Sequence, residues 1–351
     1  MNKKKIIQVI IKIILFCFIG IIGLSILSTI LLPEWTNSNE ISFILRGFYT
    51  QPKDSMEAIF VGNSNVYRGI SPMIIWEKQG YSSYNLSTPV QKMWISYYLI
   101  KEMYHYQSPK ILFLDVDEVF SDRMDSEQGM RKAFDNMKLG SAKLEAIADP
   151  NFHLSLFDQL SYIFPALRYH SRWDSLSEND FKRIRQYYSC DYKGYLAGRL
   201  VKPSDKKEKK QNYMKKKQNE KENATQIAPL SQQYLEKIIQ LCKEKNTKLV
   251  LMELPSLQTW SYEKSEAISQ FASQHDLPFI DFNKTEHIAI DWDQDTEDGG
   301  FHLNQYGAKK VSNYLANFLS NQNLLTDHRQ DSAYQDWHRV LDNYHVEFPQ
   351  D

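Results

Sequence analysis

Short apolar runs alternate with amphipathic segments along most of the chain. The runs that predict strands are AIFVGNS (58–64), SSYNLS (82–87), KILFLDVDE (110–118), KLVLMELP (248–255) and FIDFN (279–283). The segments with helical apolar spacing are WISYYLIKEMYHY (94–106), QQYLEKIIQLCKEKN (232–246), SYEKSEAISQFASQHD (261–276) and LNQYGAKKVSNYLANFLS (303–320). Strands with continuous apolar character are typical of parallel sheets that are buried on both faces. The alternation therefore predicts a doubly wound α/β domain with helices on both sides of a parallel sheet.

The first apolar run is much longer than the others. Residues 13–32 contain no charged residue, and a helix of that length extends ~30 Å, which matches the hydrocarbon core of a bilayer. The charged residues that flank the run are basic before it and acidic after it: Lys3, Lys4, Lys5 and Lys12, then Glu34 and Glu40. This asymmetry predicts a cytoplasmic N-terminus. A cleaved signal peptide is the alternative, but the run is long and no A-x-A-like site follows it. We expect residues 1–35 to form a cytoplasmic stub and a single-pass anchor in the cell membrane, with the rest of the chain extracellular.

Three further segments depart from the alternating pattern. Residues 119–200 are rich in aromatic residues and helix-like, which indicates an insertion beside the sheet. Residues 203–226 form a Lys- and Glu-rich tract with almost nothing to bury, so we expect a disordered loop there. Residues 326–351 are expected to be a polar C-terminal tail, which leaves residues 50–325 for the globular domain.

Composition mainly argues against certain partners and bound ions. The formal net charge of the 351 residues is -1, so there is no global reason to expect a nucleic-acid partner. Three scattered cysteines match neither a disulfide framework nor a zinc motif. The alternating acids of DWDQD (291–295) lack the glycine and the distal glutamate of an EF-hand loop. We therefore expect no metal ion and no cofactor.

A small polar cluster ends the first predicted strand. In FVGNSNVYRGISP (60–72), Ser64 stands between two asparagines, at a strand end where functional residues of a parallel sheet gather. A nucleophilic serine needs a base, and the base usually needs an orienting acid. His302 lies in a glycine-containing loop directly before the last predicted helix, with Asp298 four residues earlier. By spacing alone, a catalytic pair and a loop with an incidental histidine are equally consistent with this pattern.

The stretches GNSNVYRGISP and DGGFHLNQYGAKK resemble the SGNH/GDSL hydrolase superfamily, whose members act on esters or move acyl groups between oxygens. The resemblance spans most of residues 55–320. It is closest to the membrane-anchored extracytoplasmic branch, which includes the teichoic-acid D-alanylation protein and the exopolysaccharide O-acetylation proteins. It implies a flavodoxin-like three-layer domain in which Ser64 is the nucleophile, His302 the base and Asp298 the partner of the base. It also implies a cell-envelope polymer or acyl donor, and a multi-span membrane O-acyltransferase, as partners.

The position of the acid departs from the family pattern. The superfamily usually has the acid three residues before the histidine, and Gly299 occupies that position here. Asp298 stands one residue further away, and Asp295 and Glu297 are nearby substitutes.

The blocks that would form the oxyanion hole also depart from the pattern. The family usually supplies a glycine amide and an asparagine side chain, but SYNLSTPVQ (83–91) has no glycine and FLDVDE (113–118) has no Gly-x-Asn. The hole would then use the Ser64 amide together with Asn65, Asn85 or Gln91. Losing one such donor typically costs ~10²–10³ in rate.

Three functions are compatible with the sequence. The first is an anchored serine acyl esterase or acyltransferase acting on O-acyl or D-alanyl esters of a cell-envelope glycopolymer, and we prefer it. The second is a catalytically inactive scaffold for an envelope-modification complex, which the departures in the oxyanion blocks favour. The third is a non-catalytic protein that binds glycopolymer through the aromatic insertion and the Lys-rich tract.

Overall fold

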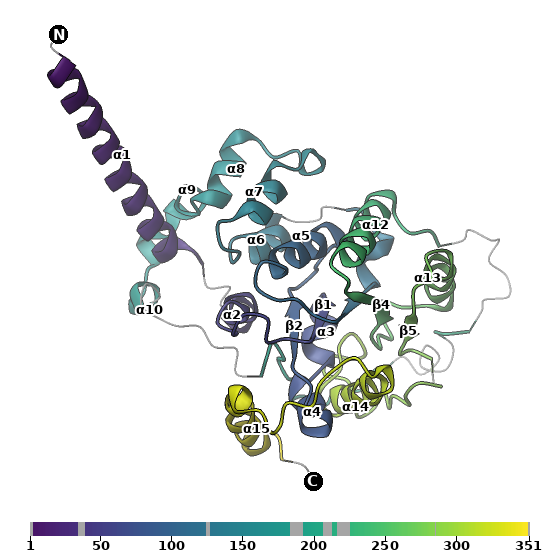
Figure 1. The fold of residues 1–351 in the computed structure, drawn as a ribbon. Coiled ribbons are helices and arrows are strands. Elements are labelled where there is room, and N and C mark those ends of the chain that lie inside the picture. Colours follow the sequence, from purple (N-terminus) through teal and green to yellow (C-terminus); the bar gives the residue numbers. More distant parts are fainter. Residues whose placement is uncertain are drawn as a thin grey trace.

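The computed structural model of the protein is built around a five-stranded parallel sheet (Figure 1). It describes residues 3–33, 39–123, 127–182, 192–205, 213–215, 225–284 and 286–349. The strands are β1 (Ala58–Gly62), β2 (Ser83–Ser87), β3 (Ile111–Asp115), β4 (Lys248–Glu253) and β5 (Phe279–Asp281). All four pairings are parallel and the order is β2-β1-β3-β4-β5, as in flavodoxin-like doubly wound sheets. The predicted α/β architecture is confirmed.

Side chains of the central strands alternate between two buried layers. In β1, Ile59 and Val61 belong to one core, and Ala58 and Phe60 belong to the other. The first face is covered by α5 (Met93–Met103), α12 (Pro229–Glu244) and α13 (Tyr262–Gln274), and the second by α3 (Ser64–Gly69), α4 (Pro72–Gln79) and α14 (Gln305–Gln322). Burial on both faces explains why these strands are continuously apolar in sequence.

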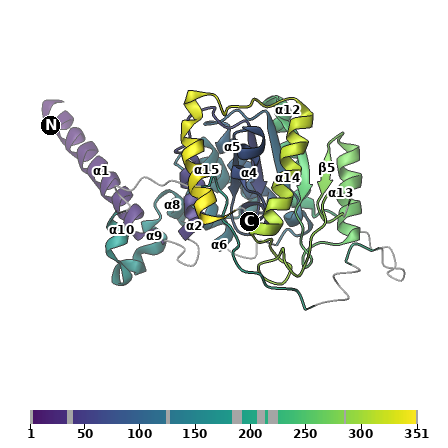
Figure 2. The same ribbon diagram turned by 90° about the horizontal axis from the view of Figure 1, so that it is seen from below.

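The C-terminal residues form a helix instead of the expected polar tail. After η4 (Ser332–Tyr334), helix α15 (Gln335–Glu347) packs beside α4, as Figure 2 shows. Its buried residues are Trp337, Val340 and Tyr344. Their spacing of three and four positions places them on one side of a helix, although the segment as a whole is polar. The expectation of a polar tail is therefore wrong.

The region between the first and second halves of the sheet is mostly helical. Its elements are η1 (Asp117–Phe120), α6 (Glu127–Phe134), α7 (Ser141–Ala148), η2 (Pro150–Phe152), α8 (Leu156–Ile163), α9 (Ala166–Tyr169), η3 (His170–Ser175) and α10 (Glu178–Lys182). Helices α6 and α7 pack against α5.

The end of the expected insertion is tied to the sheet. The backbone N–H of Asn85 in β2 donates to the carbonyl of Lys193 at 2.9 Å, and Leu196 N–H donates to the carbonyl of Tyr67 at 2.8 Å. The segment that follows residue 191 therefore belongs to the sheet domain. Most of the tract 203–226, for which we expected a disordered loop, lies outside the described residues.

Two helices precede the sheet. Helix α1 (Lys3–Leu31) has 29 residues, and its most apolar stretch has a mean hydropathy of 2.8. It extends away from the rest of the molecule (Figure 1), and it is long and apolar enough to cross a bilayer. Helix α2 (Asn39–Phe48) packs on β2, where the hydroxyl of Tyr84 donates to the carbonyl of Ile44 at 2.8 Å.

Candidate active site

The sequence Gly-Asn-Ser makes a direct turn from β1 into α3. Asn63 is the N-cap residue, and its Oδ1 accepts the backbone N–H of Asn65 at 2.8 Å. Gly62 permits close packing of the neighbouring strand, because a Cβ at this position would lie 2.4 Å from the Cβ of Asp115. Ser64 is consequently the first residue of α3, at the carboxyl edge of the sheet and beside the switch point between β1 and β3.

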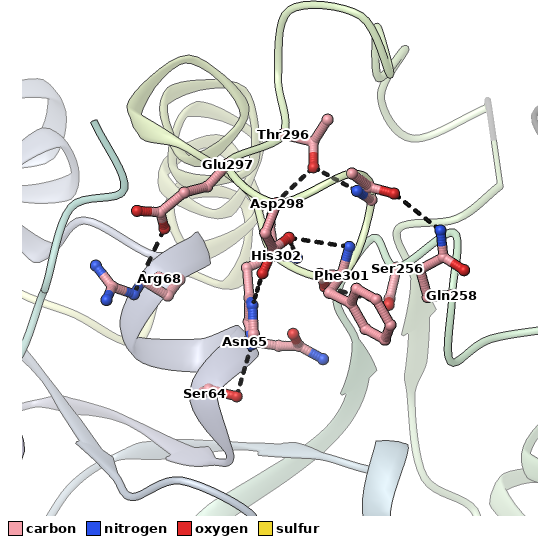
Figure 3. A network of polar contacts seen from close by, with 12 residues as sticks. Ser64, Asn65, Arg68, Ser256, Gln258, Thr296, Glu297, Asp298, Phe301 and His302 are labelled. Carbon is pink, nitrogen blue, oxygen red and sulfur yellow. Dashed lines mark hydrogen bonds and ion pairs between the residues drawn. The ribbon is translucent and has the colours of Figure 1, made fainter. Parts of the chain in front are cut away.

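His302 and Asp298 lie next to Ser64 (Figure 3). Nε2 of His302 is 2.8 Å from Oγ of Ser64, although the two residues are 238 positions apart in the chain. Nδ1 of the same ring is 2.5 Å from Oδ2 of Asp298. The side chains of His302 and Asp298 are 29% and 38% exposed, so the group is open to solvent. This arrangement can pass a proton from a hydroxyl to an imidazole that a carboxylate holds in one tautomer.

Asp298 also organises the backbone of its own loop. Its Oδ1 accepts the N–H groups of His302 at 2.8 Å and of Phe301 at 3.1 Å. Burial by itself would raise the pKa of Asp298, but the hydrogen bonds from the side chain and backbone of His302 outweigh burial and lower the pKa below its usual value. The carboxyl group is therefore ionised at neutral pH.

Two glycines explain how an acid four residues upstream reaches the histidine ring. Gly299, at the position where the family pattern has its acid, has a φ of +81°, and Gly300 has a φ of +98°. Such values suit glycine and strain other residues. The N–H of Gly300 donates to Oγ1 of Thr296 at 2.7 Å, and Gln258 Nε2 donates to the carbonyl of Gly299 at 2.8 Å. The turn is thus held from within the loop and from the segment that follows β4 (Figure 3).

The two other acids of this loop have different partners. Oδ2 of Asp295 is 2.5 Å from Nζ of Lys310, and the side chain of Asp295 is 3% exposed. Oε2 of Glu297 is 3.8 Å from Nε of Arg68. Asp298 is the acid that contacts His302, in agreement with the residue chosen from the sequence.

Two of the proposed oxyanion donors do not face Ser64. The Nδ2 group of Asn85 donates to the carbonyls of Ile70 at 2.8 Å and Gly194 at 3.4 Å. The amide of Gln91 accepts from Thr88 and donates to Ser96. Both side chains are fully buried, and the amide nitrogen of Asn85 and both groups of the Gln91 amide bond to other parts of the interior. The expectation that Asn85 or Gln91 lines an oxyanion hole is not supported by these contacts.

Asn65 remains beside the serine. Its Nδ2 lies 3.4 Å from Oδ2 of Asp117, which also accepts Nδ2 of Asn63 at 3.2 Å. The backbone N–H of Ser64 lies in the first turn of α3, where a helix offers no acceptor. The backbone N–H of Ser64 is therefore a hydrogen-bond donor next to Oγ.

Buried acids lie at the ends of β3 and β4, and Glu253 among them was not singled out from the sequence. Burial and the neighbouring charge of Asp117 raise the pKa of Asp115 well above its usual value. Burial and the charge of Asp115 do the same for Glu253, which is fully buried at the end of β4. Among the described residues, neither oxygen of Glu253 has a hydrogen-bond partner. The rule that polar residues gather at carboxyl strand ends would have identified Glu253 from the sequence.

Comparisons with known proteins give little further information. No family model matches the chain, and no curated protein matches it significantly. Solved structures do match. One is a crystal structure from Bacteroides fragilis described as a "putative acylhydrolase", which is 10% identical, covers 83% of this chain and 99% of its own, and has a TM-score of 0.37.

Proposed function

We propose that the protein is a membrane-anchored, extracytoplasmic serine acyl esterase or acyltransferase of the SGNH type. The observation that carries this proposal is the hydrogen-bond chain from Ser64 through His302 to Asp298. A hydroxyl becomes a nucleophile at neutral pH when an oriented base can take its proton, and these three residues provide the hydroxyl, the base and the orienting carboxylate.

In the first half of the reaction, Oγ of Ser64 attacks the carbonyl carbon of an ester and its proton moves to Nε2 of His302. The ester C–O bond then breaks, the proton passes to the leaving alcohol, and the acyl group stays on Ser64. In the second half, water or a sugar hydroxyl attacks the acyl-enzyme and gives its proton to Nε2, which returns it to Ser64. Water as acceptor makes the protein an esterase, and a sugar hydroxyl makes it a transferase.

We assign stabilisation of the oxyanion to the backbone N–H of Ser64 and the side-chain amide of Asn65. The place of Ser64 as the first residue of α3 supports the first donor, and the adjacent position of Asn65 in the chain supports the second. A hole with two donors is smaller than the family pattern implies, and each donor is then worth ~10²–10³ in rate.

The proposed substrate is an O-acyl or D-alanyl ester on a cell-envelope glycopolymer. Support comes from α1, which is long and apolar enough to span a bilayer, and from the basic residues that precede its apolar part. A catalytic domain on the outer side of that membrane meets envelope polymers and not cytoplasmic esters.

The proposal is tested with the full-length protein in detergent, a fluorophosphonate probe and a panel of acyl esters. We expect the probe to label the wild-type chain and not Ser64→Ala, and ester turnover to fall on the order of 10⁴-fold or more in Ser64→Ala and His302→Ala. Ser273→Ala, at an exposed position of α13, is the matched control. Full turnover in Ser64→Ala, with unchanged thermal unfolding, would show that the serine only makes a turn.

The orientation is tested separately. A reporter that works only outside the cytosol, fused after residue 50, should be active because the positive charges precede the apolar run. A signal from a cytosol-restricted reporter at the same position would reject the extracytoplasmic assignment and leave the catalytic proposal standing.

The scaffold function stays a second candidate because Asn85 and Gln91 point into the interior. It predicts that the wild-type protein neither reacts with the probe nor turns over esters. It also predicts that cells carrying Ser64→Ala modify their envelope as the wild type does. Catalysis predicts the opposite result in both measurements.

A further inference from the structure

Helices of the insertion expose a group of large apolar side chains. On α8, Leu156, Phe157 and Leu160 have exposed fractions of 73%, 58% and 39%. Positions i, i+1 and i+4 lie on one side of a helix. Trp173 in η3 is 66% exposed and Phe181 in α10 is 51% exposed. Isolated apolar residues on a surface need no explanation, but several on neighbouring elements mark an interaction site.

These elements are fixed to the end of α1. Oγ of Ser28 accepts the N–H of Ala166 at 3.2 Å, and Nη1 of Arg172 donates to the carbonyl of Leu31 at 2.8 Å. Arg172 also pairs with Asp180 of α10 at 3.0 Å. Helices α9 and α10 and the turn η3 all pack against α1, and Figure 1 shows them at its C-terminal end.

The apolar surface of α1 continues as far as this junction. Ile26 and Leu27 are 45% and 40% exposed, whereas Ile30, Leu31 and Leu32 are buried by the rest of the protein. If α1 crosses a bilayer, the place where its side chains become covered by protein lies near the outer surface of that bilayer. Trp173 in η3 and Phe181 in α10 belong to elements that pack against α1 at this place, and α8 adjoins them through its contacts with α9.

We propose that α8, η3 and α10 form a foot that rests on the lipid bilayer, with Leu156, Phe157, Leu160, Trp173 and Phe181 inserted at the level of the headgroups. Tryptophan is enriched at this level of membranes, and amphipathic helices that lie in it bury their apolar side chains. The occupant we assign is lipid and not a second protein, because α9, η3 and α10 pack against the helix that is long and apolar enough to span the bilayer. The foot would hold the catalytic domain in one orientation on the membrane, so that Ser64 stays at a constant height above it.

This inference rests on the anchoring part of the proposed function, so its test includes an independent measurement of α1. The full-length protein is placed in nanodiscs of phospholipid alone and carries a nitroxide on one cysteine. Phe157→Cys and Trp173→Cys are labelled in a background with Cys17→Ser and Cys190→Ser, since Cys242 is buried. Val346→Cys, at a position 84% exposed on α15, is the matched control. Native Cys17, labelled with Cys190→Ser alone, reports on α1.

The readout is the relative access of oxygen, which dissolves in lipid, and of a water-soluble nickel chelate. We expect labels at 157 and 173 to lie about 5–10 Å below the headgroup surface, the label at 346 to be in water, and the label at 17 to be deep in the lipid. Labels at 157 and 173 that behave like 346, with 17 in lipid, would overturn the foot, leave the anchor intact and assign the patch to a protein partner. A label at 17 in water would overturn the anchor and the foot together. Neither result bears on the reactivity of Ser64.

Discussion

At the scale of single residues, the orientation of His302 depends on the carboxylate of Asp298, both oxygens of which take part in hydrogen bonds. Oδ2 of Asp298 faces Nδ1 of the ring, and Oδ1 accepts two backbone N–H groups of the loop. From the sequence, neighbouring acids were expected to retain some function if Asp298 were lost. In the structure Asp295 is engaged by Lys310 and Glu297 pairs with Arg68, so neither is available to the ring.

We therefore predict a large effect for Asp298→Asn. The amide oxygen can still accept the backbone N–H groups, but the NH₂ group would face Nδ1 and favour the tautomer with the proton on Nε2. That tautomer cannot accept a proton from Ser64, so kcat should fall by ~10³–10⁴ without loss of folding. Ester turnover and thermal unfolding are measured together, with Asp54→Asn, in the exposed turn before β1, as control. A loss below about a hundredfold, the low end of what general acid–base catalysis typically contributes, would argue against an orienting role.

At the scale of elements, the end of β4 carries a fully buried carboxyl group. Glu253 is fully buried next to Asp115, and among the described residues neither of its oxygens has a hydrogen-bond partner. The folded state therefore favours the protonated form of this carboxyl, whose pKa is raised by burial and by the neighbouring acid. The contribution of Glu253 to stability is fully present below its ordinary pKa of ~4.3 and is lost as the pH rises through the raised value.

Glu253→Gln should remove this pH dependence. In the window above pH ~4.3 the unfolded chain releases a proton that the folded chain retains, so the free energy of unfolding of the wild type falls by up to ~1.4 kcal/mol per pH unit from this group. We expect the variant to gain stability relative to the wild type as the pH rises. Denaturant unfolding at several pH values measures the difference, with Glu236→Gln, exposed on α12, as control. A difference that does not change with pH would contradict the raised pKa.

At the scale of the whole molecule, the C-terminal helix is part of the domain core. Trp337 of α15 is 3% exposed and stacks on Trp76 of α4, with ring centroids 4.8 Å apart. Nζ of Lys193, in the segment that runs past β2, lies 4.7 Å from the centroid of the Trp337 ring. Helix α15 thus connects α4 to the segment around Lys193, which also bonds to α3 through the N–H of Leu196 and the carbonyl of Tyr67.

Trp337→Ala should destabilise the domain by ~3–5 kcal/mol, because it removes a large buried aromatic side chain and leaves a cavity. Val346→Ala on the same helix removes a side chain that is 84% exposed and should change stability by less than about 0.5 kcal/mol. Denaturant unfolding of the two variants provides the comparison. Equal effects would mean that α15 is dispensable for the core.

The sequence by itself determined the order and type of the main elements. Strands such as β3 are apolar up to their last residue because both faces of the sheet are covered, and helices such as α14 repeat their apolar residues every three or four positions. It also indicated Ser64, His302 and Asp298, because nucleophile, base and acid stand at a strand end and in a loop before a helix. The sequence did not indicate the C-terminal helix, because only three buried residues in a polar segment follow the helical apolar spacing.

Only the tertiary structure decided which polar groups meet. Ser64 and His302 come together because α14 packs on α3 and α4 and so carries the loop after the edge strand β5 back to the end of β1. The same packing engages Asp295 and Glu297 with other residues and turns Asn85 and Gln91 inward. A side-chain amide near a strand end has the same sequence pattern whether it faces a cleft or the core. Its direction depends on hydrogen-bond partners from distant parts of the chain, and local spacing holds no information about them.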